Sequence, residues 1–181
     1  MSKTIQHLRM AALCVAMTGL TTSVYAASAD GDASANVVTP LTVTATATTM
    51  DFGDVAAGTV LSTIDLATDG SRTVATGDAE VLTTNTGVAA IFNVNGADGA
   101  TYSITFPAPG TATLENAGGD TLTVDTFVTN KTGDEGTIGA GTPGDTFSVG
   151  ATLNLPAGAN PGLYSTTIGG GSAYTVTVNY N

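Results

Sequence analysis

Apolar residues alternate with threonine or other polar residues along several stretches of this chain. Over residues 41–48, Leu, Val and Ala alternate with four threonines; residues 147–155 are apolar at every odd position, and residues 174–180 at every even position. A period of two places alternate side chains on opposite faces of a strand. After residue 26, no stretch of about 11 residues has apolar residues at helical spacing. The chain is therefore expected to fold from strands.

Further strands are expected where β-branched and apolar residues lie between glycine-containing turns. These segments are residues 60–67, 72–75, 80–82, 90–94, 101–106, 112–115, 121–128 and a strand that opens at 161–164. Turns are expected at 68–71 and 118–120, and a long glycine-rich loop at 129–145. Many short strands at roughly regular spacing predict an all-β fold, an antiparallel immunoglobulin-like β-sandwich.

The first 26 residues have the pattern of a secretory signal peptide. Lys3 and Arg9 precede a largely apolar run over residues 10–20, and residues 24–26 (VYA) place small or apolar residues at the cleavage positions. Cleavage after Ala26 would leave 155 of the 181 residues, enough for one domain with a continuous core. Residues 27–36 are small and acidic and are expected to form a flexible leader, and residues 37–181 a single sandwich domain. The expected location is the periplasm, the cell surface or the medium.

The charge balance argues against several classes of partner. After Ala26 the chain keeps two basic residues, Arg72 and Lys131, against 15 acidic ones, which gives a net charge of −13. Nucleic acid and anionic lipid both need Lys and Arg in the protein that binds them, so neither is an expected partner. No second apolar stretch reaches the ~20 residues of a spanning helix, and no membrane insertion of the mature chain is expected.

The inventory of reactive side chains also restricts function. His7 and Cys14 are the only histidine and cysteine, and both precede residue 26. Without them a mature chain has no disulfide, no Ser-His-Asp or Cys-His catalytic site and no His/Cys zinc site. Two pairs of neighbouring carboxylates, Asp51 with Asp54 and Asp78 with Glu80, could serve glycosidic chemistry, but such pairs are more typical of turns. We expect no catalytic residue, no cofactor and no bound metal, and therefore not an enzyme.

Three clusters at residues 30–32, 69–71 and 133–135 combine Asp or Glu with glycine and offer the oxygen ligands that calcium prefers. Aspartate beside glycine is also common in turns, and turns are the preferred interpretation. Arg72 is expected to pair with a carboxylate on its own hairpin. Lys131 lies in a polar stretch and is expected to be exposed to water, which disfavours an amide bond from its side chain to an Asn or Asp.

Several phrases resemble a known family when taken in order. They are residues 35–43 (ANVVTPLTV), 50–55 (MDFGDV), 101–105 (TYSIT), 161–164 (PGLY) and 174–180 (YTVTVNY). Together they resemble the domain of unknown function 4402 family of secreted bacterial proteins, and more distantly the subunits of chaperone-usher pili.

The pilus resemblance implies an immunoglobulin-like fold that is completed by a strand from a neighbouring subunit. Residues before Leu41 would supply a donor strand, and residues 174–180 would form an edge strand that an assembly chaperone could bind. The implied assembly residues are Val37, Leu41, Val43, Tyr174, Val176, Val178 and Tyr180. The alternate positions of the leader, from Ala29 to Ala35, carry only alanine and glycine, which bury little apolar surface.

These observations favour a non-catalytic, secreted, cell-surface structural or adhesive protein, a pilus or fibre subunit that assembles by β-strand addition. Its expected partners are further copies of itself, other surface-fibre subunits and a periplasmic chaperone. The alternative is a monomeric extracellular module that binds carbohydrate or calcium through its glycine-rich loops.

Overall fold

The computed structural model describes residues 26–46 and 49–181. Val37–Asn181 forms one compact unit. Residues 26–36 are exposed and form no helix or strand. The predicted signal peptide, residues 1–26, lies outside the described residues except for Ala26.

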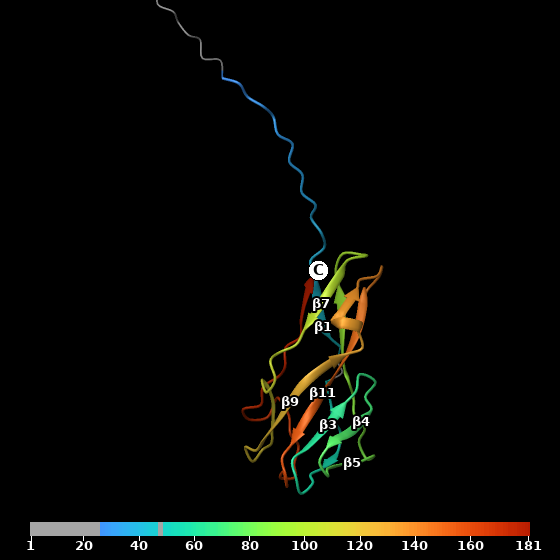
Figure 1. Cartoon of the computed structure of the whole chain (residues 1–181), viewed down its shortest axis with the longest axis vertical. Coiled ribbons are helices and arrows are strands. Elements are labelled where there is room, and N and C mark those ends of the chain that lie inside the picture. Colours follow the sequence, from blue (N-terminus) through green and yellow to red (C-terminus); the bar gives the residue numbers. More distant parts are fainter. Residues whose placement is uncertain (1–25, 47–48) are drawn as a thin grey trace, which may run out of the picture. The chain divides into compact units, whose positions relative to one another are not determined.

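Strands make up the regular structure of the described residues, together with one three-residue 3₁₀ segment, η1 (Figure 1). In chain order the elements are β1 (Thr42–Ala45), β2 (Val55–Ala56), β3 (Ser62–Leu66), β4 (Arg72–Thr76), β5 (Glu80–Val81), β6 (Ala90–Asn95), β7 (Thr101–Thr105), β8 (Ala112–Glu115), β9 (Thr121–Thr129), η1 (Thr132–Asp134), β10 (Glu135–Thr137), β11 (Asp145–Leu155) and β12 (Thr177–Tyr180). In this part of the chain, no helix has the length and apolar character needed to cross a membrane.

The strands form three antiparallel sheets. The largest has seven strands in the order β1-β6-β11-β3-β4, with β9 paired to β11 and β8 paired to β9. A three-stranded sheet has the order β10-β7-β12, and a ribbon pairs β2 with β5. The predicted all-β antiparallel sandwich is confirmed.

Strand β11 runs through the middle of the largest sheet (Figure 1). Its first half pairs with β6, and its second half pairs with both β3 and β9. The apolar residues at its odd positions, from Phe147 to Leu155, are all buried, as their period of two predicts. One face of the sheet therefore carries an uninterrupted apolar row.

Two clusters of buried residues lie along this face. The β7 core lies under the three-stranded sheet and contains Ala90, Val94, Tyr102, Ile104, Ile138, Phe147 and Val149. The β3 core contains Phe52, Ile64, Leu66, Ala112, Leu122, Val124, Ala151, Leu153 and Leu155. Val55 and Val81 of the β2–β5 ribbon and Tyr164 and Tyr174 pack against the β3 core.

Three predictions about segments were wrong. The loop expected at 129–145 contains η1 and β10, because Gly136 has no side chain and lets β10 pair with β7 directly above the Tyr102 ring. The strand expected at 161–164 is absent, because this segment bends back and the Tyr164 hydroxyl donates to the Asn160 carbonyl. The strand expected at 174–180 begins only at Thr177, since the preceding residues pair with β8 through Ser172 before the chain reaches β7.

Candidate functional site

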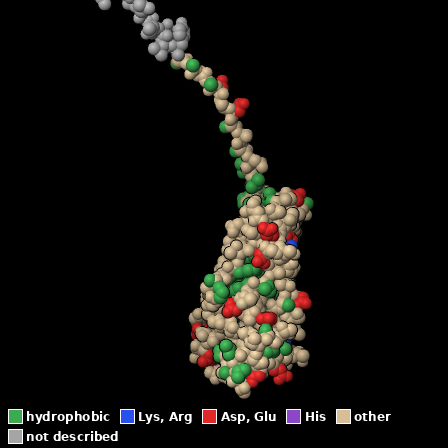
Figure 2. Space-filling model, in the orientation of Figure 1, with side chains coloured by type: hydrophobic (Ala, Val, Ile, Leu, Met, Phe, Trp, Pro, Cys, Tyr) green, Lys and Arg blue, Asp and Glu red, His purple; other side chains and the backbone are tan. Residues whose placement is uncertain are grey.

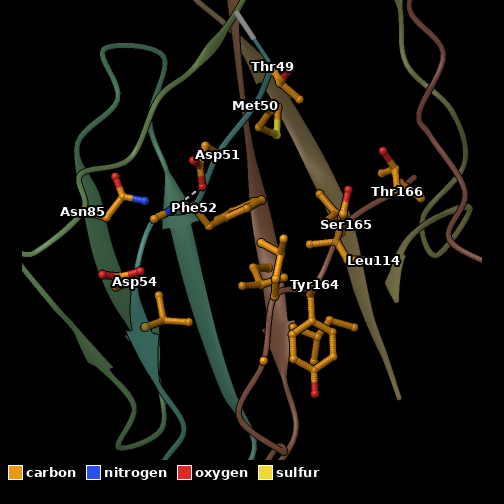
Figure 3. Close-up of a pocket in the computed structure, with 18 of the residues that line it drawn as sticks. Thr49, Met50, Asp51, Phe52, Asp54, Asn85, Leu114, Tyr164, Ser165 and Thr166 are labelled. Atoms are coloured by element: carbon orange, nitrogen blue, oxygen red, sulfur yellow. Dashed lines mark hydrogen bonds between the residues drawn. The ribbon is translucent and has the colours of Figure 1, made fainter. Parts of the chain in front are cut away.

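An apolar groove with a volume of about 800 Å³ lies over the β3 core. Its floor consists of Ala112 and Leu114 of β8, Leu122 and Val124 of β9, and Leu153 of β11. Residues 49–55 form one wall, and residues 162–166 with 173–174 form the other. Figure 3 shows the two walls as separate segments, with the Phe52 ring pointing between them. The groove is thus a place where the second layer of the sandwich does not cover the first.

The first wall is held by an isolated bridge on the side away from the groove. The Asp51 amide donates to the Val88 carbonyl at 2.9 Å, and the Val88 amide donates back at 2.8 Å. In an antiparallel pair, successive residues direct their peptide groups to opposite sides. The N–H and C=O of Met50 and the N–H of Phe52 accordingly have no hydrogen-bond partner among the described residues.

Arg72 fixes this wall from behind. Its guanidinium donates to four backbone carbonyls: those of Phe52 at 2.6 Å, Asp54 at 3.0 Å, Leu82 at 2.6 Å and Asn85 at 2.9 Å. The prediction of a carboxylate partner on the Arg72 hairpin was wrong, because these carbonyls accept from both terminal nitrogens and use four of the five N–H donors. Arg72 thereby ties residues 52–54 to residues 82–85.

Gly53 makes this bend of the wall feasible. Its φ is +61°, a value that favours glycine, and a side chain there would collide with the Asn85 carbonyl and the Arg72 guanidinium. The Asp51 carboxylate accepts a hydrogen bond from the Gly53 amide at 2.7 Å, drawn as the dashed line in Figure 3. The sequence 51–54 therefore specifies a bent edge segment.

The second wall has a matching bridge. The amides and carbonyls of Ser165 and Glu115 exchange two hydrogen bonds of 3.0 Å, which joins this wall to β8. Tyr164 and Thr166, on either side of Ser165, have no backbone hydrogen-bond partner among the described residues. Both residues line the groove, and their unpaired backbone groups lie on the side of this wall away from β8.

Side chains at the end of the second wall pin it to the β8–β9 turn. The Asp120 carboxylate accepts hydrogen bonds from Asn116 at 2.9 Å and from Asn160 at 3.0 Å. These two bonds lower the pKa of Asp120. On the same side of the groove, burial raises the pKa of Tyr174 to about 12, so this hydroxyl stays protonated at neutral pH.

The residues that line the groove carry two charges, both negative. They are the carboxylates of Asp51 and Asp54 on the first wall. No Lys or Arg side chain of the described residues lines the groove. Figure 2 shows acidic side chains spread over the visible face of the body and very few basic atoms there.

Lys131 belongs to the other half of the sandwich. Its Nζ lies 2.7 and 2.8 Å from the two carboxylate oxygens of Asp145, and the Tyr102 hydroxyl donates to the same carboxylate at 2.9 Å. The Lys131 side chain is only 22% exposed, so the expectation of a fully solvated lysine was wrong. The reason is that β11 begins at Asp145 and brings a carboxylate to the loop.

Burial alone would raise the pKa of Asp145. Hydrogen bonds from Lys131, the Thr146 amide and Tyr102 outweigh burial and hold that pKa below its ordinary value. Burial, and then the bond to Asp145, raises the pKa of Tyr102. The cluster is therefore an ion pair with a neutral phenol, which favours the charged forms over an amide between Lys131 and Asp145.

The model of the family described as "Domain of unknown function (DUF4402)" matches residues 41–180. The chain belongs to this family. The resemblance to the domain of unknown function 4402 family, inferred from the sequence phrases, is confirmed. No curated protein and no solved structure matches the chain.

In this DUF4402 chain, six of the seven predicted assembly residues are partly buried and lie against the same core. Leu41, Val43, Tyr174, Val176, Val178 and Tyr180 all pack against the β7 core. The seventh, Val37, is 92% exposed. Of the seven, only Tyr174 lines the groove.

Sequence reasoning missed most of the groove. The one signal available was the phrase at residues 50–55, because Phe52 stands between two aspartates in a segment too short for a full strand. Its partner wall at 162–166 was expected to be a strand. Nothing in the sequence shows that these two segments lie opposite each other.

The Asp-Gly clusters serve as turns where the structure describes their contacts. The Asp69 carboxylate accepts hydrogen bonds from the Ser71 hydroxyl and amide, which lower its pKa. The pKa of Asp78 is likewise lowered, by the hydroxyl and amide of Thr59 and the amide of Val60. No three His, Cys, Asp or Glu side chains gather into a metal site among residues 26–46 and 49–181.

Proposed function

We propose that this protein is a non-catalytic, secreted structural or adhesive component of the cell surface, a fibre subunit that accepts a β-strand at the groove. The observation that carries the proposal is the pair of unpaired backbone edges, at Met50–Phe52 and at Tyr164–Thr166, on the two sides of an apolar floor. A strand laid between such edges gains ladder hydrogen bonds, and its alternate side chains reach the floor. The complete sandwich would then be immunoglobulin-like with one strand supplied by the partner.

The chemistry of the groove supports a binding role over a catalytic one. Its two carboxylates, Asp51 and Asp54, lie on the same wall, three residues apart in the sequence. The Asp51 carboxylate already accepts a hydrogen bond from the Gly53 amide. General acid and base catalysis on a glycosidic bond needs two carboxyl groups that flank the bond from opposite sides. An apolar floor of leucine, valine and alanine instead fits the side chains of a strand.

Strand addition can be tested before the partner is known, by fusing a strand to the mature chain. A Gly/Ser linker after Asn181 would carry a nine-residue segment of alternating valine and threonine, which the linker presents at roughly millimolar effective concentration. The fusion is expected to raise the melting temperature by several degrees. A second fusion with the same residues in the order Val-Val-Val-Val followed by threonines is the control.

A raised melting temperature for the alternating fusion alone supports the proposal, since only period two puts every valine on the floor. Equal melting temperatures for both fusions and the unfused chain would contradict it. Substituting Leu114, a half-buried floor residue, with glutamate should abolish the increase. The same change at the exposed Thr121 on β9 should leave it intact.

A carbohydrate-binding module is the second candidate function. The volume of the groove lies within the range of small-molecule sites, and Asn85, Asp54 and Tyr164 border it with polar groups. This function predicts that the unfused mature chain gains melting temperature with a soluble oligosaccharide such as maltoheptaose or chitopentaose. An increase with sugar and none with the alternating fusion would favour the module over strand addition.

A further inference from the structure

We infer that the strand accepted by the groove comes from a different protein and is an apolar segment flanked by lysine or arginine. This inference rests on the proposed function and adds the chemistry of the partner. It follows from three features of the molecule: the charge of the groove, the use of this chain's own cations, and the side chains of its leader.

The first feature is the net negative charge of one wall, whose two carboxylates outnumber the single guanidinium of Arg72 behind it. Asp51 and Asp54 are both exposed and border the groove. The Asp54 side chain has no hydrogen-bond or ion-pair partner among the described residues. An incoming strand with an acidic residue near this wall would be repelled, and a basic residue at the same place would be attracted. The groove therefore selects for positive charge at the flank of its apolar strand.

The second feature is that this chain has no free Lys or Arg side chain after residue 26 to offer to another copy. Arg72 uses its donors on four backbone carbonyls, and Lys131 pairs with Asp145. These are the only basic residues after residue 26. Two mature copies would each carry a net charge of −13, so their approach is opposed at low ionic strength.

The third feature is the leader. Residues 27–36 carry Asp30 and Asp32, and their other side chains are alanine, glycine, serine and asparagine. The floor is built from leucine, valine and alanine side chains and offers apolar contact to an incoming strand. Alanine and glycine bury much less apolar area than valine or leucine would, at roughly 25 cal/mol per Å². The leader thus lacks both the charge and the side chains that the groove fits.

The nearest rival occupant is the uncharged segment 33–39 of a second copy. It contains Val37 and Val38, which are 92% and 51% exposed. Three synthetic peptides separate these occupants: a Thr/Val alternating strand with a lysine at each end, its twin with glutamate at each end, and residues 33–39 of this chain. Their dissociation constants for the mature chain would be measured by fluorescence anisotropy at low and high salt.

The lysine-flanked peptide is expected to bind about tenfold more tightly than its glutamate twin at ~20 mM salt, and about twofold more tightly at ~0.5 M. It should also bind more tightly than the 33–39 peptide. Equal affinities for the two twins, or tightest binding by residues 33–39, would overturn the inference and leave strand addition intact. Failure of all three peptides to bind would overturn the proposed function and the inference together.

Variants of the wall locate the source of the preference. Asp51→Asn combined with Asp54→Asn should reduce the tenfold preference to about twofold, because both charges are lost. The wall should keep its shape, since the side-chain oxygen at position 51 can still accept a hydrogen bond from the Gly53 amide. Asp98→Asn is the matched control, since Asp98 is exposed in the β6–β7 turn and does not line the groove. A preference that survives in the double variant would overturn the inference.

Discussion

The β7 core and the β3 core lie on the same face of the same sheet, yet they are covered differently. Over the β7 core, strand β7 places Tyr102 and Ile104 directly onto Phe147 and Val149, and β10 and β12 flank it. Over the β3 core, the cover is divided between the β2–β5 ribbon and residues 162–174, and the groove separates them. Because β11 supplies apolar residues evenly to both halves, the missing cover belongs to the second layer alone. An apolar surface left open in this way is typical of a binding site.

The largest expected effect tests the closed half. Phe147 is fully buried, and its ring stacks on Phe92 with centroids 5.4 Å apart and lies 6.5 Å from the Tyr102 ring. Phe147→Ala should lower the free energy of unfolding by about 3–5 kcal/mol, because a sealed core cannot collapse onto the cavity. Urea denaturation measures this. A loss under about 1 kcal/mol would mean that the β7 core is not closed as described.

The next effect concerns the groove wall. Arg72→Met keeps the length of the side chain but removes a donor from four carbonyls. The partly buried carbonyls of Phe52 and Leu82 are then left with no donor among the described residues, whereas those of Asp54 and Asn85 keep a backbone amide. The expected destabilisation is about 1–3 kcal/mol. Amide exchange should accelerate over residues 51–54 and 82–88 and stay unchanged over β7. Uniform acceleration in both halves would contradict a local role for Arg72.

A pair of leucines compares a partly exposed position of the groove floor with a buried one. Leu153 is 2% exposed, whereas Leu114 is half-buried and borders the groove. Leu153→Ala should cost about 2–5 kcal/mol, and Leu114→Ala only about 1 kcal/mol, because less apolar surface returns to water. Equal costs would indicate that the groove is closed in solution. The two variants would be compared in one denaturation series.

The smallest effect is a pH dependence in the closed half. Since the pKa of Asp145 is lowered from 3.8, the unfolded chain binds more protons than the folded chain just below that pH. The stabilisation is complete above pH 3.8 and is lost as pH falls through the lowered value. Lys131→Met removes a main cause of the lowered pKa, so stability should fall less steeply as the pH is lowered. Near neutral pH, the substitution should lower the free energy of unfolding by about 1 kcal/mol or less. Melting temperatures between about pH 2 and pH 7 measure both. An unchanged acid profile would show that the ion pair does not set it.

Much of the fold could be predicted because local pattern determines it. The period of two at residues 147–155 predicted β11 and its buried face, and residues 112–115 were predicted with the observed bounds of β8. The family was predicted from five short sequence phrases taken in order along the chain, and the family match over residues 41–180 confirms it. Pairing order and the division of the second layer were not predicted, because they depend on contacts between distant segments.

The site could not be predicted for the same reason. Arg72 was expected to bind a neighbouring carboxylate, but it binds carbonyls 10 to 20 residues away along the chain. The edge was expected at residues 174–180, where alternation is strong. The unpaired edges at Met50–Phe52 and Tyr164–Thr166 lie in segments with hardly any strand pattern, and each segment makes only a single bridge, to Val88 and to Glu115 of β8 respectively.

Amide exchange measured with and without the bound lysine-flanked strand tests the acceptor most directly. We expect the amides of Met50, Phe52, Tyr164 and Thr166 to become slow to exchange, since a strand in the groove would accept hydrogen bonds from both walls. Protection confined to β12 (Thr177–Tyr180), with no change at the two walls, would contradict it and place the acceptor at the opposite half of the sandwich.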